Sequence, residues 1–336
     1  MRNLFLASEN PSHRLLCRAL LLVGALVVLP GCRRDCEGAG CEASYAGARV
    51  HVLSLPRVAG DAMVLAPDAA WLQVVELTGR VDQGSERALL LEDGVLWLGI
   101  PSEGEILRVE LAGEDDALDS GLAPQTDLGA LDASWASGDS TELFGATLAS
   151  TGDLDGDGVD EMVVGAPSRS LGLEVSMGTL THQSGAVYVL SGAGSSEEQD
   201  TAEDLVCQDF SCLQGLLGTH GEGRLGETLA SCADEADTWV VAAPLAPGCG
   251  LDDDGQRTPQ LAGRVYAIRG TGLGGDTPEE AASTWWWGSD RAGRAGHALS
   301  CASDLVGGDS PDLLVGAPFA DGDAGAAAGA VYLLNL

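Results

Sequence analysis

Three stretches of the chain carry the same three anchors in the same order, about 75 residues apart. The first anchor is an apolar residue followed by Gly, and the second is an apolar run that ends in Ala-Pro. The third is a Gly that precedes a predicted strand beginning with Ala-Val-Tyr or Arg-Val-Tyr. The prolines of the second anchor are Pro167, Pro244 and Pro318. Recurrence at this spacing predicts an array of similar units, each burying its faces against its neighbours.

The runs within each unit have the properties of buried strands. They contain four to six β-branched or apolar residues and are bounded by Gly and Pro, which is typical of strands. Apolar residues at consecutive positions indicate cover on both faces. Helical periodicity is nearly absent. The sequence therefore predicts an all-β fold, a β-propeller, with a β-sandwich as the competing architecture.

The repeats set the domain boundaries. A propeller domain is expected over residues 47–336, and blades of about 45 to 60 residues would give five to seven of them. The clear repeats cover residues 139–192, 219–270 and 290–334, and degenerate repeats cover residues 47–112. Residues 47–53 match the third anchor alone, which suggests that they complete the last blade and so close the ring.

The first 31 residues have the pattern of an export signal. Arg2, Arg14 and Arg18 precede a short apolar run, and Leu-Pro-Gly-Cys follows, ending at Cys32. This segment resembles the bacterial lipoprotein signal, in which Cys32 would carry the lipid; an ordinary signal peptide is the alternative. We therefore expect an exported lipoprotein, held at the outer membrane or the cell surface. A Cys-containing linker over residues 32–46 would join its lipid anchor to the propeller. The sequence does not decide which membrane holds the anchor.

Composition limits the partners. The net charge is −34, with no Lys in the chain, which excludes nucleic acid and anionic lipid surfaces because both need a basic face. An apolar content of 45% is enough for a core. Disulfides are permissible after export, but pairing is not decided for seven cysteines: Cys36, Cys41, Cys207, Cys212, Cys232, Cys249 and Cys301. The spacing favours two small local loops, one closed by Cys36 and Cys41 and the other by Cys207 and Cys212.

One loop carries a metal-binding pattern. Asp153, Asp155, Asp157 and Glu161 stand at positions 1, 3, 5 and 9 of a short Gly-containing segment, and Val159 at position 7 would add its carbonyl oxygen. Hard oxygen ligands at this number and charge favour Ca²⁺. A solvated acidic turn is the alternative.

With its flanking anchors, this loop resembles the FG-GAP repeat of integrin α-chain propellers and their bacterial relatives. The matching segments are Phe144-Gly145, residues 153–161, Gly165-Ala166-Pro167 and residues 185–188. The resemblance implies a propeller with calcium loops on one face. In the family, this architecture serves cell-surface adhesion or protein recognition and sometimes accompanies a catalytic domain.

The other two loops depart from the pattern. In the last repeat, Asp304 and Asp312 match Asp153 and Glu161, but two of the four side-chain ligands are missing, and metal binding there is undecided. The loop of the middle repeat is shortened, and no metal is expected.

The expected function is recognition or adhesion, with a surface protein or glycan as partner and calcium as a structural element. No G-x-S-x-G or H-E-x-x-H sequence is present, and no enzymatic activity is expected. The alternative is the catalytic or non-catalytic propeller of a secreted hydrolase. The triple tryptophan at 285–287 is expected to pack between blades, with a sugar- or peptide-stacking surface as the alternative.

Overall fold

The computed structural model describes residues 26–32, 45–53, 71–77, 88–92, 95–110, 125–127, 134–137, 139–154, 158–170, 183–190, 212–232, 237–248, 261–270, 276–302, 305, 310–321 and 325–336. Two compact units make up the chain, and the first consists of Met1–Gln83, Asp93–Val95 and Val109–Asp132. Most of the predicted leader and the linker, residues 1–25 and 33–44, lie outside the described residues. No helix among the described residues has the length and apolar character needed to cross a membrane.

The first unit contains one sheet in the order β1-β2-β3-β7. Its strands are β1 (Leu26–Cys32), β2 (Tyr45–Leu53), β3 (Trp71–Leu77) and the short β7 (Gln125–Asp127), which pairs in parallel with β3. Residues 47–53 therefore form a strand, as predicted. Strand β2 pairs with β1, which lies in the predicted leader, and with β3; its hypothesised role in closing the last sheet stays a prediction.

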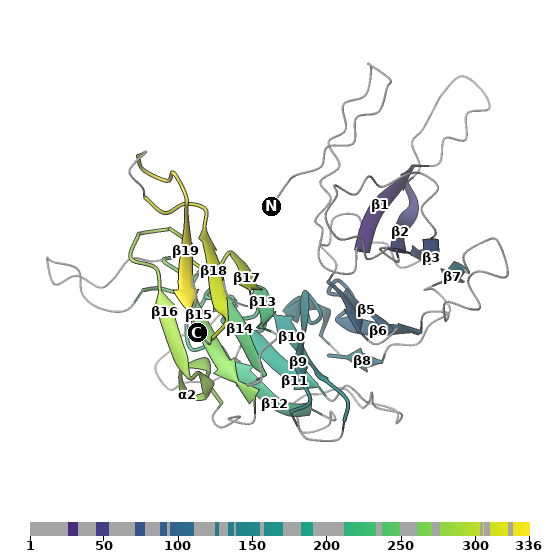
Figure 1. Cartoon of the computed structure of the whole chain (residues 1–336), viewed down its shortest axis with the longest axis horizontal. Coiled ribbons are helices and arrows are strands. Elements are labelled where there is room, and N and C mark those ends of the chain that lie inside the picture. Colours follow the sequence, from purple (N-terminus) through teal and green to yellow (C-terminus); the bar gives the residue numbers. More distant parts are fainter. Residues whose placement is uncertain are drawn as a thin grey trace, which may run out of the picture. The chain divides into compact units, whose positions relative to one another are not determined.

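Four further sheets, which lie mainly in the second unit, follow one another along the chain (Figure 1). The first has strands β4 (Leu89–Glu92), β5 (Val95–Ile100), β6 (Glu105–Glu110) and β8 (Trp135–Ala136). The second has strands β9 (Thr147–Gly152), β10 (Glu161–Ala166), β11 (Ala186–Leu190) and β12 (Cys212–Leu217). The third has strands β13 (Thr228–Cys232), β14 (Thr238–Ala243), β15 (Arg264–Arg269) and β16 (Thr284–Trp287). The last has three strands: β17 (Ala298–Ala302), β18 (Asp312–Ala317) and β19 (Ala330–Asn335).

Helical structure is limited to short turns among the described residues. They are the 3-10 helix η2 (Ser140–Glu142) and the one-turn helix α2 (Pro278–Ala281). The prediction of an all-β fold built from propeller-type blades is confirmed. The number of blades, five to seven, stays a prediction.

Successive sheets pack face to face. The first strand of the third sheet, β13, contacts the first strands of both neighbours, β9 and β17. One apolar core joins Val187 and Val189 to Trp239 and Tyr266 of the next sheet, and a second joins the third sheet to the last. Strands β10, β11 and β14 are buried along their whole length, which confirms the predicted cover on both faces.

The repeated glycines allow the close approach of neighbouring sheets. Gly165 stands in the Gly-Ala-Pro anchor of one repeat, and Gly226 follows the apolar anchor residue of the next. A Cβ atom on Gly165 would lie 2.1 Å from the carbonyl oxygen of Gly226. Gly226 also has a φ of +86°, a conformation that side chains disfavour. The first two anchors of the repeat are therefore the two sides of one backbone-to-backbone contact between sheets.

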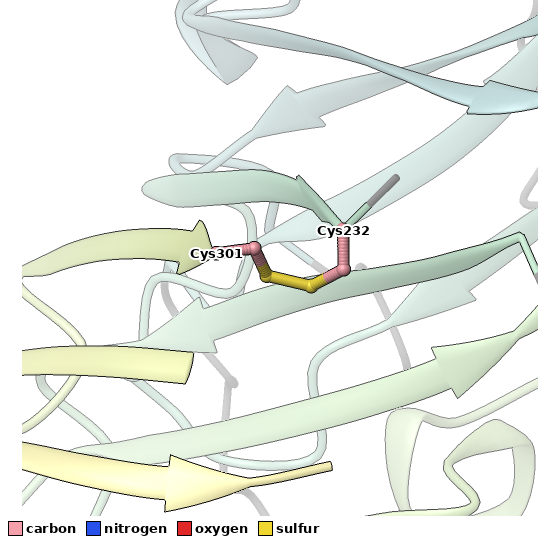
Figure 2. The surroundings of a disulfide bond; sticks show 2 residues. All are labelled: Cys232 and Cys301. Carbon is pink, nitrogen blue, oxygen red and sulfur yellow. A yellow bond between two sulfur atoms is a disulfide. The ribbon is translucent and has the colours of Figure 1, made fainter. Parts of the chain in front are cut away.

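A disulfide joins the first strands of two neighbouring sheets. Cys232 at the end of β13 bonds Cys301 in β17, with the two Cα atoms 5.0 Å apart (Figure 2). The sequence left this pairing open, and it links residues 69 positions apart. Cys36, Cys41, Cys207 and Cys249 lie outside the described residues, and so does the side chain of Cys212, so the two predicted local loops stay predictions.

Candidate functional site

The predicted metal loop connects the first two strands of the second sheet. Strand β9 ends at Gly152, and β10 begins at Glu161, which pairs with Gly152 across the antiparallel ladder. This pairing brings the two ends of the loop, Asp153 and Glu161, to neighbouring positions. Gly158 has a φ of +89° and open space around its Cα, so the loop can turn back sharply. Asp155 and Asp157 lie outside the described residues.

Hydrogen bonds within the loop hold both described carboxylates. The amide of Gly158 donates to Oδ2 of Asp153 over 2.9 Å. The amide of Leu154 donates to Oε2 of Glu161, whose side chain is fully buried. Glu161, at the end of the loop, is therefore held in the protein interior, whereas Asp153, at its start, is half-buried.

The same arrangement recurs in the last repeat. Asp312 begins β18 as Glu161 begins β10, and it is also fully buried. Its Oδ2 accepts a hydrogen bond from the amide of Leu305 over 2.5 Å, and Asn335 donates to its Oδ1. This recurrence supports the sequence alignment of Asp312 with Glu161. In the middle repeat the equivalent position is Thr238, buried and uncharged.

The residues present fit a hard cation. Asp153 and Glu161 supply carboxylate oxygens at the two ends of a loop whose turn is made by a left-handed glycine, and Val159 is exposed on the loop between them. Such oxygen donors suit Ca²⁺. The described residues by themselves contain no cluster of three or more His, Cys, Asp or Glu side chains able to hold a metal, and Asp304 of the last loop also falls outside them.

A buried ion pair distinguishes the second sheet from the next two. Arg169 binds Glu142, with 13% and 10% of their side chains exposed. Burial raises the pKa of Glu142 above its ordinary value, and Arg169 acts against this rise. Nearby, hydrogen bonds from Thr141 lower the pKa of Asp139. The sequence analysis did not find this pair, because its members are 27 residues apart and no motif marks them.

The residues that stand in place of Glu142 and Arg169 in the next two sheets are small and uncharged. The amide of Ser168 donates to the carbonyl of Glu142, just as Leu245 donates to Gly223 and Phe319 to Gly293. Where the second sheet has Arg169, the next two have Ala246 and Ala320. The fold therefore accommodates either a buried ion pair or a small apolar contact at this point.

A second polar cluster surrounds the carboxylate of Glu279 in α2. Its Oε1 accepts hydrogen bonds from Tyr266 over 2.7 Å, from Arg264 over 3.0 Å and from Thr219 over 3.1 Å. His220 lies beside it, with Nδ1 2.8 Å from the hydroxyl of Thr219. Because one carboxylate accepts from three donors, Glu279 fastens α2 to β15 and to the segment that follows β12.

The pH response of this cluster can be predicted from His220. Burial, together with the charge of Arg264, lowers the pKa of His220 below its ordinary value, so the unfolded chain takes up a proton at a higher pH than the folded one. The stability contributed by neutral His220 is present above the unfolded pKa and is lost as the pH falls from that value through the folded pKa. We expect His220→Gln to reduce the loss of melting temperature between pH 8 and pH 5. The exposed His297, changed to Gln, is the control; an equal effect there would contradict the prediction.

The three tryptophans of β16 have different surroundings. Trp285 stacks near Tyr266 of its own sheet, with ring centroids 6.1 Å apart, and packs against the core shared with the second sheet. Trp286 packs against the core shared with the last sheet. Both therefore follow the predicted packing between sheets. Trp287 is 48% exposed.

Comparison with known proteins supports the resemblance seen in the sequence. The FG-GAP repeat family matches residues 144–190. Integrin alpha-PS2 of Drosophila melanogaster is 30% identical over 184 residues, which cover 54% of this chain and 12% of that protein. Integrin alpha-5 of Xenopus laevis is 29% identical over 177 residues, 52% of this chain and 14% of its own length. The chain thus contains an FG-GAP repeat and is integrin α-like over about half its length, but it spans a small part of these relatives.

Proposed function

We propose that this FG-GAP-containing, integrin α-like chain is an exported, lipid-anchored recognition module that binds an extracellular protein or glycan, with calcium as a structural element. The observation that carries the proposal is the matched repeat at residues 144–190, which includes the metal loop between β9 and β10. The similar integrin α chains are the second support. The proposal is non-enzymatic, and the polar cluster at Glu279 has a structural role in it, fastening α2 to β15.

In this proposal, Asp153, Asp155, Asp157 and Glu161 hold the calcium ion with their side chains and Val159 with its carbonyl oxygen. The bound ion supplies positive charge among carboxylates that repel one another. Glu161, buried and bonded to the amide of Leu154, fixes the end of the loop nearest the core. Asp153, bonded to the amide of Gly158, fixes the turn.

Calcium is expected to raise the melting temperature of the chain. Binding to the folded state alone adds about 2.7 kcal/mol at a calcium concentration 100 times the Kd. Asp155→Ala/Asp157→Ala should abolish this rise, as measured by thermal unfolding in calcium and in EDTA. The control is Asp321→Ala, at an exposed residue in the loop after β18 whose carboxylate accepts a hydrogen bond from the amide of Ala327. Without a calcium-dependent rise in the wild type, the loop would be a solvated acidic turn.

Two observations bear on the cellular location. Cys32 follows the lipoprotein-like segment, and the disulfide between Cys232 and Cys301 is of a kind that persists in oxidising compartments. Expression in a bacterial host should place the wild type in the membrane fraction and Cys32→Ala in the soluble exported fraction. Equal membrane retention of both proteins would refute lipid anchoring at Cys32.

The recognition role itself is tested by direct binding. The chain is applied to a glycan array and to immobilised extracellular-matrix proteins, in calcium and in EDTA. We expect saturable binding to one class of target, weakened by Asp155→Ala/Asp157→Ala. Absence of saturable binding on both panels would overturn the recognition role and leave the calcium proposal to its own test.

A further inference from the structure

One carboxylate of the third sheet lies against the start of the metal loop. A Cβ atom on Gly152, the last residue of β9, would lie 2.3 Å from Oδ1 of Asp237 and 2.9 Å from its Cγ. Asp237 directly precedes β14 of the third sheet, and Gly152 directly precedes Asp153, the first predicted ligand. Two neighbouring sheets therefore meet at the point where the metal loop begins.

The third sheet itself holds Asp237 in place. The amide of Gly270, directly after β15, donates to the carbonyl oxygen of Asp237 over 3.3 Å, and Thr238 pairs with Arg269. Asp237 has a φ of +48°, a left-handed conformation that Asp and Asn adopt more readily than most residues. The backbone would accept Asn equally well, so the negative charge at this position needs a separate explanation.

Comparison between the repeats supplies that explanation. Thr238 and Asp312 are equivalent, so the position of Asp237 corresponds to Pro311 in the last repeat. Pro311 is uncharged, and the sheet before it in the chain, the third, has the shortened loop without the ligand pattern. The sheet before Asp237 has the loop with four carboxylates. Of these two positions, the acid occurs at the one that follows the predicted metal loop.

The effect of this charge depends on whether the loop holds a cation. A carboxylate beside four others raises the electrostatic free energy of the empty loop, because like charges repel. The same carboxylate lowers the free energy of a loop that holds Ca²⁺, since it attracts the divalent charge. Asp237 is therefore placed to favour the occupied loop over the empty one.

We propose that Asp237 strengthens calcium binding by the metal loop of the second sheet, and that calcium in return strengthens the contact between the second and third sheets. Such coupling is reciprocal by thermodynamic necessity. The role is electrostatic: among the described residues, Asp237 does not form a metal-holding cluster with Asp153 and Glu161. The inference rests on the proposed structural role of calcium.

Calcium affinity tests the charge of Asp237. Asp237→Asn removes the charge but retains an oxygen acceptor and a residue type suited to the left-handed backbone. The matched control, Asp160→Asn, removes the same charge from an exposed residue of the metal loop that is not among the predicted ligands. In isothermal titration of the full chain with CaCl₂, we expect Asp237→Asn to weaken binding roughly threefold to tenfold. The loss in Asp160→Asn should be smaller, because solvent and salt screen an exposed charge.

Melting temperatures distinguish this role from a purely structural one. Thermal unfolding of Asp237→Asn and of the wild type is measured in calcium and in EDTA. We expect the variant to melt below the wild type in calcium, and at the same temperature or higher in EDTA, where the change relieves repulsion. An equal loss under both conditions would make Asp237 only a structural residue of the contact between sheets, and would overturn the proposal.

Hydrogen exchange, followed by mass spectrometry, tests the coupling between the sheets. Amides that exchange through local opening report how firmly each strand is held. In the wild type, calcium should slow exchange in β13 and β14 as well as in β9 and β10. In Asp237→Asn at saturating calcium, the slowing should persist in β9 and β10 and diminish in β13 and β14. Slowing confined to β9 and β10 in the wild type would refute the coupling.

The outcomes separate this inference from the proposed function. If the wild type binds no calcium, the proposed calcium role fails and this inference fails with it. If the wild type binds calcium and Asp237→Asn binds it equally well, only the role of Asp237 fails. Equal weakening in Asp237→Asn and Asp160→Asn would mean general charge attraction, and would also overturn the specific role of Asp237.

Discussion

Arg169→Ala is expected to lower the free energy of unfolding by about 3–5 kcal/mol, the usual effect of removing one partner of a buried ion pair. The side chain of Glu142 is 10% exposed, and the variant leaves its charge without Arg169. Urea unfolding at pH 7 measures the loss. Because burial already raises the pKa of Glu142, the carboxyl of the variant can become neutral in mild acid. The difference in free energy of unfolding between the wild type and Arg169→Ala should therefore be smaller at pH 5 than at pH 7.

The third sheet provides the control for this prediction. Gly223 and Ala246 meet where the second sheet has Glu142 and Arg169, and a Cβ on Gly223 would lie 3.5 Å from that of Ala246, an ordinary contact. Glu142→Ala/Arg169→Ala copies this arrangement and should recover most of the stability lost in Arg169→Ala. A double variant as unstable as Arg169→Ala would show that lost packing of the Arg side chain, rather than the uncompensated charge, causes the effect.

The repeat anchors made most of the fold predictable. Gly165 and Gly226 stand within the recurring anchors, and their backbones approach so closely that a Cβ atom on Gly165 would clash with the carbonyl oxygen of Gly226. Consecutive apolar residues in β10 and β14 predicted burial on both faces, and both strands are buried throughout. These features depend on local sequence alone, so one chain was enough to reveal them.

The features that sequence did not predict depend on distant neighbours. Arg169 and Glu142 form a buried ion pair, although they are 27 residues apart and no motif marks them. Which residues meet is decided by the fold, which the local pattern does not contain. Asp153 and Glu161 flank one hairpin connection. Asp155 and Asp157 fall outside the described residues, so the full ligand set stays a prediction.

Loss of the disulfide should have an effect as large as loss of the ion pair. The bond joins Cys232 to Cys301, 69 residues apart, and in the chain-entropy description a loop of this length gives about 4 kcal/mol of stability. The bond also links β13 to β17, whose sheets share an apolar core. We expect Cys232→Ala/Cys301→Ala to lower the free energy of unfolding by about 3–4 kcal/mol, as measured by urea unfolding without reductant.

Reductant separates this bond from any formed by the other cysteines. Dithiothreitol should destabilise the wild type by at least the amount lost in Cys232→Ala/Cys301→Ala, and any further loss that it causes in the variant belongs to other disulfides. The first strands β13 and β17 also contact each other directly, so packing could hold them together without the bond. If the variant matched the wild type in stability, that packing would suffice, and the disulfide would constrain the unfolded chain less than its 69-residue span implies.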